Sequence, residues 1–157
     1  MTVSLIPMTQ NDFAQYTSSA IKEYADEKVK AGTWTIDEAL TKSSREYQRL
    51  LPDGMDSHHQ YLYVIADSEG RKIGWLWYKF DERHPQKEAF IFDFKIFEEK
   101  QGLGYAKAAL RALDDLAVKR GIKKISLHVF SHNKRAIYLY EKLDYKATDI
   151  NMSKWLE

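Results

Sequence analysis

A chain of 157 residues with 44% hydrophobic and 30% charged residues is typical of one globular domain with a sizeable core. Its 24 Lys and Arg nearly balance its 23 Asp and Glu, leaving a net charge of +1, which argues against nucleic acid as the main partner. The lack of cysteine excludes a disulfide framework, a thiolate metal site and a cysteine nucleophile.

The first half of the sequence indicates one strand, two helices and a hairpin. A short strand is expected at residues 3–8. Helices are expected at 9–30 and 35–50, because each begins at a threonine with an acidic residue three positions later. The charged stretch 23–30 is expected to be a solvated helix face. Two strands at 60–66 and 72–80, joined by a polar turn that contains glycine, predict the hairpin.

The second half indicates a central strand followed by alternating helices and strands. Residues 88–97 are nearly all apolar, as in a strand covered on both faces. The apolar stripe that begins at Ala106 predicts a helix that stops at Gly121. A strand at 124–130, a helix capped by Asn133 and a last strand at 147–153 complete an α+β or mixed α/β sandwich in a single domain spanning 1–157.

Two glycines join the central strand to the next helix. In Gly102-Leu103-Gly104 they allow a tight turn, and the unpaired N–H groups of the first helical turn favour an anion such as a pyrophosphate. The alternative is a tight turn that binds nothing. A dinucleotide-binding fold is disfavoured because Lys107 stands where a third small residue is needed, and no Walker lysine followed by Ser or Thr is present.

Two segments resemble the GNAT superfamily of N-acetyltransferases. The loop 101–106 (QGLGYA) is similar to the family's Q/R-x-x-G-x-G/A motif, and 133–145 (NKRAIYLYEKLDY) is similar to its N-x-x-A-x-x-x-Y-E-K-x-G-F segment. The second segment departs from the family at Asp144, where glycine is usual. Aspartate tolerates the left-handed conformation better than most residues, so the turn can survive.

The resemblance implies a splayed, mostly antiparallel mixed sheet of six to seven strands, flanked by about four helices. It also implies acetyl-CoA as cosubstrate, with its pantetheine arm between the fourth and fifth strands. Backbone groups of Phe94 and Ile96 would pair with that arm, and the amide of Asn133 would reach it. The pyrophosphate would be held by the motif itself, which comprises Gln101, Gly102, Leu103, Gly104, Tyr105 and Ala106.

Acyl transfer from a thioester to an amine needs a base for the amine and a proton donor for the departing thiolate. By resemblance Tyr140 is the general acid; the alternative is one more tyrosine packing an apolar face. Asp93 is the only carboxylate inside the apolar run 90–96, and burial there would raise its pKa toward that of a useful base. Asp93 could equally be structural, and Glu88 is the second candidate.

The remaining expectations concern ligands, partners and location. The five histidines lack a carboxylate cluster at ligand spacing, so no metal is expected. The expected partner is a small-molecule or peptide amine, with a homodimer suggested by resemblance alone. No stretch approaches the roughly 18 apolar residues of a membrane span, and no signal peptide is recognised, so the cytoplasm is expected. A catalytically silent CoA-binding sensor or scaffold, an unusual acyl donor and a non-amine acceptor remain alternatives.

Overall fold

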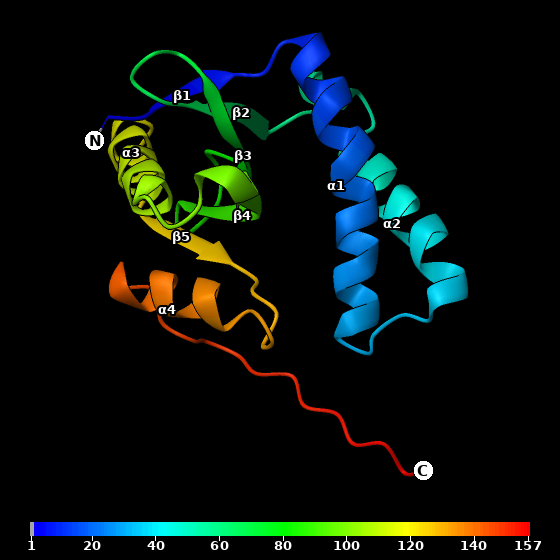
Figure 1. Cartoon of the computed structure of the whole chain (residues 1–157). Helices are drawn as coiled ribbons and strands as arrows, with labels where there is room; N and C mark the ends of the chain where they lie inside the picture. Colours follow the sequence, from blue (N-terminus) through cyan, green and yellow to red (C-terminus); the bar gives the residue numbers. More distant parts are fainter. Residues whose placement is uncertain (1) are drawn as a thin grey trace.

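The computed structural model describes residues 2–157, which form an open sheet flanked by helices (Figure 1). Two single-turn 3-10 helices lie at Gly54–Asp56 and Glu98–Lys100. The other elements, in chain order, are β1 (Ser4–Pro7), α1 (Gln10–Lys30), α2 (Ile36–Leu50), β2 (Gln60–Ala66), β3 (Lys72–Phe80), β4 (Glu88–Ile96), α3 (Tyr105–Lys119), β5 (Lys124–Leu127) and α4 (Lys134–Lys142).

The sheet has the strand order β1-β2-β3-β4-β5, and its neighbours are antiparallel except for β4 and β5. The parallel pairing of β4 with β5 covers only Glu88–Ile91 and Lys124–Leu127, so the carboxyl half of β4 has no strand on that side. This is a mixed, mostly antiparallel α+β sheet with four helices, and the predicted fold class is confirmed. The β2–β3 hairpin has the bounds that the sequence predicted.

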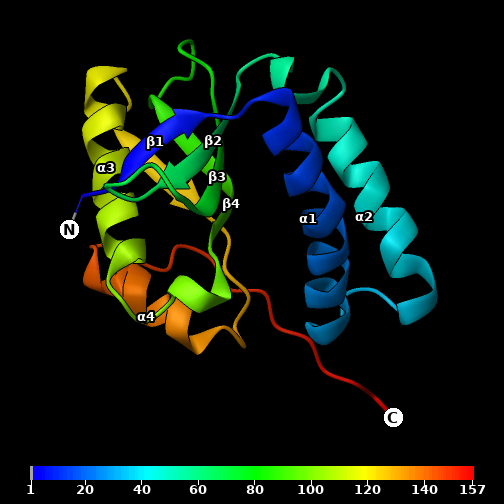
Figure 2. The same cartoon turned by 45° about the horizontal axis from the view of Figure 1, so that its top comes forward.

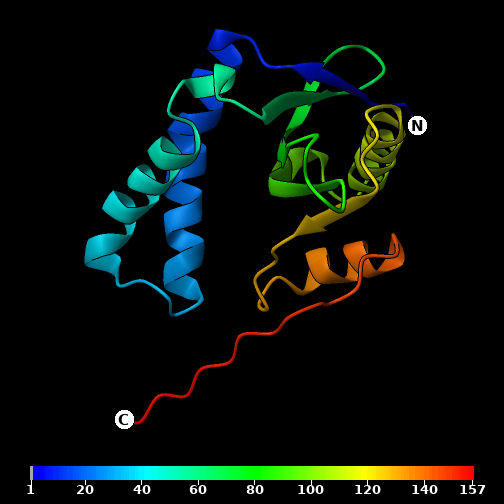
Figure 3. The same ribbon diagram turned by 180° about the vertical axis from the view of Figure 1, so that it is seen from behind.

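The predicted strand count is wrong: residues 2–157 contain five paired strands instead of six to seven. Residues 147–153 were expected to return to the sheet as a strand, but they pair with no strand of the same chain. Figure 3 shows why, because the chain leaves α4 and runs away from the sheet. β5 also ends earlier than expected, at Leu127, where the parallel pairing with β4 stops.

The helices cover the two faces of the sheet and bury separate cores (Figure 2). On one face α1 and α2 pack against the odd-numbered tryptophans of β3, Trp75 and Trp77, with Tyr16 and Tyr47 between them. On the other face α3 packs against Leu76 and Tyr78 and their neighbours. The alternation of β-strand side chains thus divides one strand between two cores. No helix within residues 2–157 has the length and apolar character required to cross a membrane.

The helix ends follow the signals in the sequence. Thr9 and Asp12 form a reciprocal capping box at the start of α1, and Glu38 accepts a hydrogen bond from the Thr35 backbone N–H at the start of α2. At the end of α4, Asp144 adopts the left-handed conformation, with φ of 70°. The aspartate that replaces the family's glycine therefore keeps the expected turn.

A β-bulge interrupts the pairing of β3 with β4. Trp77 pairs with Asp93 and Tyr78 pairs with Ile91, so Phe92 is an extra residue on β4. The bulge changes which side chains share a face: Phe92 packs in the core beneath α1 and α2, and the following residue, Asp93, also faces α1. Without the bulge, strict alternation would place Asp93 beside Ile91 in the opposite core.

Candidate active site

The candidate active site is a cleft of about 910 Å³ that begins where β4 and β5 separate. α1 and α2 form one wall, β4 forms the floor, and the glycine loop, the segment after β5 and α4 form the rest. Of the predicted site residues, Leu103, whose side chain is exposed, and the second base candidate, Glu88, lie outside the cleft lining. The structure therefore brings together residues that lie more than 45 positions apart between Asp93 and Tyr140.

The glycine loop has the backbone geometry that its sequence predicted. Gly102 and Gly104 both adopt the left-handed region, with φ of 78° and 87°, and Gly104 is the N-cap of α3. A Cβ built on Gly102 would lie 3.6 Å from the guanidinium of Arg135, which also contacts the Gln101 side-chain oxygen at 3.4 Å. The loop thus combines a helix N-terminus with a nearby cation, which suits an anion.

The carboxyl half of β4 presents a free backbone edge to the cleft. The Lys95 carbonyl lies against Gly74 on β3, so close that a Cβ at residue 74 would be 2.1 Å from that oxygen. Backbone groups alternate along a strand, so those of Phe94 and Ile96 face the opposite edge. The Gln101 side chain lies at that opposite edge, and its amide donates to the Ile96 carbonyl at 2.9 Å, so this carbonyl points away from β3. The free edge therefore includes the two residues predicted to pair with pantetheine.

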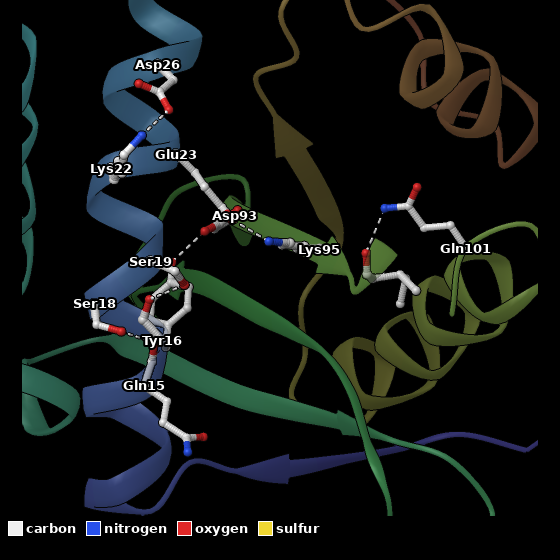
Figure 4. A network of polar contacts seen from close by, with 11 residues as sticks. Gln15, Tyr16, Ser18, Ser19, Lys22, Glu23, Asp26, Asp93, Lys95 and Gln101 are labelled. Carbon is white, nitrogen blue, oxygen red and sulfur yellow. Dashed lines mark hydrogen bonds and ion pairs between the residues drawn. The ribbon is translucent and has the colours of Figure 1, made fainter. Parts of the chain in front are cut away.

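Asp93 lies on the cleft floor and faces α1 (Figure 4). The buried hydroxyl of Tyr16 donates to its carboxylate at 2.6 Å. Burial raises the pKa of Asp93 above its ordinary value, although the Tyr16 hydrogen bond opposes that rise. A partly buried carboxylate with a raised pKa is a better proton acceptor than a solvated one, which is the property predicted for Asp93.

The second base candidate, Glu88, has the opposite environment. It lies at the start of β4, where the Ser126 hydroxyl donates to it and Lys124 lies 3.7 Å away. The hydrogen bond and the positive charge lower the pKa of Glu88. Glu88 is also absent from the cleft lining, so both its position and its charge favour Asp93.

Tyr140 lies on α4 and lines the cleft across from β4. Burial and the negative charge of Asp93 raise the pKa of Tyr140 to about 12. The hydroxyl therefore stays protonated near neutral pH, as a proton donor must. The ring of Tyr140 also packs against the α3-side core and lies 5.5 Å from the ring of Tyr145, so the residue has a packing role as well.

Asn133 caps α4, as predicted, with its side-chain oxygen accepting from the Ala136 backbone N–H at 3.2 Å. It also lines the cleft. Its amide nitrogen is not needed for the cap, so contact with pantetheine stays a compatible prediction.

One wall of the cleft is acidic, which the sequence did not predict. The stretch 23–30 was expected to be solvated, yet Glu23 and Glu27 line the cleft, together with Glu46 of α2. Glu23 pairs with Lys95 of β4, and Glu27 contacts His132 (Figure 4 shows the first pair). Glu23 and Glu27 are four residues apart on one helical face, and this spacing was the available signal. Among residues 2–157 no group of three or more His, Asp or Glu side chains is placed to hold a metal.

Comparison with known proteins decides the family. Residues 21–145 match the model of the Acetyltransferase (GNAT) family. The chain belongs to the GNAT family of acetyltransferases. Within this family it is 46% identical to YycN of Bacillus subtilis strain 168, described as an uncharacterized N-acetyltransferase, over 99% of this chain and 100% of that one. YdgE, described in the same words and from the same strain, is 40% identical over 99% of both chains.

The solved structures agree with the family assignment. The crystal structure of YycN superposes with a TM-score of 0.97 over 99% of both chains. The GNAT protein described here is accordingly an acyltransferase, and its family carries out acetyl transfer from acetyl-CoA. The roles of the individual cleft residues remain predictions from their geometry.

Proposed function

We propose that this enzyme transfers the acetyl group of acetyl-CoA to a primary amine by direct attack in a ternary complex. The observation that carries the proposal is the arrangement of one cleft, in which the glycine loop, the free edge of β4, Asp93 and Tyr140 all face the same space. No cysteine is present to carry an acetyl group, which favours direct transfer over a cysteine-linked acyl-enzyme.

The residues of the cleft fit acetyl-CoA in both charge and shape. The N–H groups from Gly102 to Ala106 are at or before the first turn of α3, where no intrahelical partner exists for them. They would hold the pyrophosphate, with Arg135 nearby. The backbone groups of Phe94 and the N–H of Ile96 would pair with the amides of the pantetheine arm as an added strand would, because the Ile96 carbonyl already accepts from Gln101. Leu103, whose side chain is exposed, would contribute only its backbone.

Each step of the chemistry has a candidate residue. Asp93 would accept the proton that the attacking amine loses as its nitrogen bonds to the acetyl carbon. A backbone N–H on the free edge of β4 would stabilise the negative charge that develops on the thioester oxygen. Tyr140 would donate its proton to the sulfur as the carbon–sulfur bond breaks. Proton transfer from Asp93 back to Tyr140 through solvent would restore both groups.

The charges along the cleft favour a cationic acceptor. Cations gather at the glycine loop and α4, where Lys100, Lys107, Arg135 and Lys142 line the cleft. Carboxylates outnumber cations at the other end, where Glu23, Glu27, Glu46 and Asp93 line the cleft with Lys28 and Lys95, and Lys95 is paired with Glu23. An anionic cofactor at one end and an amine with further positive charge at the other would match this separation. The amine is expected to be a small molecule or peptide in the cytoplasm.

A panel of amines tests the proposal. Free thiol released from acetyl-CoA is measured for polyamines, amino sugars, amino acids and lysine peptides, each against an acidic or hydroxyl analogue. We expect release with cationic primary amines and none with the hydroxyl analogues. Cofactor binding without release above background hydrolysis for every amine would favour a silent CoA-binding module. Release only with hydroxyl acceptors, or only with another acyl-CoA, would identify the other two alternatives.

A further inference from the structure

Tyr16 is a buried tyrosine of α1 whose hydroxyl contacts the Asp93 carboxylate. Its ring lies in the core between α1 and the sheet, where 1% of the residue is exposed, and it packs edge-on against Trp75 with 5.9 Å between the ring centroids. Tyr47 of α2 lies beside it, with 6.4 Å between the centroids. Rings that are enclosed in this way keep one position, so the Tyr16 hydroxyl is fixed relative to the sheet.

The bulge of β4 brings the carboxylate to this hydroxyl. The extra residue Phe92 turns Asp93 toward α1, and the Tyr16 hydroxyl donates to Asp93 Oδ2 at 2.6 Å (Figure 4). A phenylalanine has the same ring, so packing alone does not require a tyrosine at position 16. A buried hydroxyl and a carboxylate beside it each need a hydrogen-bond partner, and here each is a partner of the other.

This hydrogen bond has one direction near neutral pH. Burial raises the pKa of Tyr16 well above its ordinary value of 10.0, and the charge of Asp93 and the nearby Tyr47 raise it further. The phenol therefore keeps its proton and is always the donor of the hydrogen bond. Such a donor stabilises the ionised carboxylate, so it lowers the pKa of Asp93 against the larger effect of burial.

Other titratable groups face Asp93, but their effects differ from that of Tyr16. Glu23 of α1 raises the pKa of Asp93 through its charge, and Lys95 of β4 lowers it. These two also pair with each other. Tyr47 of α2 and Tyr140 of α4 stay protonated, because burial and the charge of Asp93 raise the pKa of both. Among residues 2–157, the only side chain that hydrogen-bonds the carboxylate is that of Tyr16.

We propose that Tyr16 is a positioning residue for acetyl transfer, because it occupies Oδ2 of Asp93 and leaves Oδ1 to accept the proton of the attacking amine. Asp93 lines the cleft and Tyr16 does not, so the oxygen that is not bound to Tyr16 is the one open to a substrate. This inference rests on the proposed function, in which Asp93 is the base.

Tyr16 takes no part in the proton transfer itself. As the amine nitrogen bonds to the acetyl carbon, the amine proton passes to Oδ1 of Asp93, while the phenol keeps its own proton. The role of the hydrogen bond is to hold the carboxylate in place and to keep it ionised at lower pH than burial alone would allow. The enzyme would therefore stay active further into the acidic range than it would with a phenylalanine at position 16.

The pH–rate profile of Tyr16→Phe tests this role. Loss of a hydrogen bond to a charged group should move the acidic limb of kcat/KM to higher pH by about one pH unit or more. With the same amine, kcat/KM should fall by about tenfold or more on that limb, and the loss should shrink toward pH 9. Tyr78→Phe is the matched control, since it removes the hydroxyl of a fully buried tyrosine outside the cleft. A Tyr16→Phe limb that coincides with the control would overturn the proposal.

A second variant changes the same hydrogen bond in the opposite direction. With 3-fluorotyrosine at position 16 the hydroxyl is kept and becomes more acidic, so it donates a stronger hydrogen bond and should move the acidic limb to lower pH. A limb that moves to higher pH in this variant would also overturn the proposal.

Titration of the Asp93 carboxyl by ¹³C NMR tests the hydrogen bond without turnover. The Asp93 signal is assigned by its loss in Asp93→Asn, and its midpoint should move to higher pH in Tyr16→Phe but not in Tyr78→Phe. An unmoved midpoint in folded Tyr16→Phe would overturn the proposal. A midpoint that moves while the acidic limb stays would overturn the positioning role and remove Asp93 as the base. Failure of the proposed function would be seen separately, as no thiol release by the wild type.

Discussion

At the scale of single residues, the environment of Asp93 separates its two possible roles. A purely structural aspartate would be expected to have its carboxylate saturated by donors or paired with a cation. Asp93 accepts from Tyr16 at 2.6 Å, and the Phe94 backbone and the charge of Lys95 also favour its ionised form, but burial outweighs them and raises its pKa. Its charge also acts on Tyr140, whose pKa rises to about 12. The raised pKa makes the Asp93 carboxylate a stronger proton acceptor than a solvated one, and the raised pKa of Tyr140 keeps the phenol protonated near neutral pH as the acid.

The variant Asp93→Asn should lower the turnover number by about 10²- to 10⁴-fold, the usual contribution of a general base. It should also remove the acidic limb of the pH–rate profile, which is expected above the ordinary aspartate value of 3.8 because the pKa is raised. Steady-state kinetics between pH 5 and 9 measure both effects. Asp26→Asn, an exposed change on α1, is the control and should leave the profile unaltered.

The same substitution has a predicted effect on stability. Because the pKa of Asp93 is higher in the folded state than in the unfolded chain, the folded state loses stability as pH rises through that range. Asp93→Asn removes this loss, so the variant should melt at a higher temperature than the wild type at pH 8. The difference should shrink as pH falls toward 3.8. A lower melting temperature at pH 8 would indicate that the carboxylate itself stabilises the fold.

At the scale of elements, two irregularities of β4 and one turn organise the cleft. The bulge at Phe92 directs Asp93 toward α1, the early end of pairing with β5 frees the backbone of Phe94 and Ile96, and the glycine loop starts α3 in line with that edge. All three features are properties of the backbone. They explain how a strand that is apolar on both faces can also serve as the floor of a polar site.

The variant Gly104→Ala tests the glycine loop. A Cβ in the left-handed conformation costs about 1–2 kcal/mol, so stability should fall, and affinity for acetyl-CoA should fall as well because the loop N–H groups shift. Gly121→Ala carries a matched backbone penalty, since Gly121 has φ of 80°, but it lies at the far end of α3. Calorimetric titration should give weaker binding for the first variant alone. Equal affinities would contradict a role for the loop.

The variant Gly74→Ala tests the packing of β3 against β4. Its Cβ would meet the Lys95 carbonyl at 2.1 Å, so the strands must separate, at a cost of about 1–3 kcal/mol. Urea unfolding should give a lower midpoint than the wild type. An unchanged midpoint would show that the β4 edge is looser than the contact at Gly74 indicates.

At the scale of the whole molecule, the sequence was sufficient to predict most of the fold and the cofactor end of the candidate site, but not its acceptor end. The hairpin, the caps of α1 and α4 and the glycine loop are local patterns, and their residues carry the signal by themselves. The Tyr16–Asp93 contact joins residues 77 positions apart and depends on the bulge, which has no clear local signal. The final strand was wrong for a different reason: alternation of side chains does not specify a pairing partner, and residues 147–153 run away from the sheet instead of joining its edge (Figure 3).

The acceptor end is also a property of the whole molecule. Glu23, Glu27 and Glu46 come from two helices, and only their packing over β4 turns separate charged positions into one wall. Periodicity alone does not specify that arrangement. The charge separation along the cleft is therefore the feature that the structure adds to the family resemblance.

The variant Tyr140→Phe is the decisive test of acetyl transfer in this cleft. Affinity for acetyl-CoA, measured by calorimetry, should stay within a few-fold of the wild type, while the turnover number for the best amine should fall by about 10²- to 10⁴-fold. Tyr61→Phe, which removes a hydroxyl outside the cleft, should change neither. Undiminished turnover in Tyr140→Phe, at unchanged affinity, would show that Tyr140 is not the proton donor of this cleft.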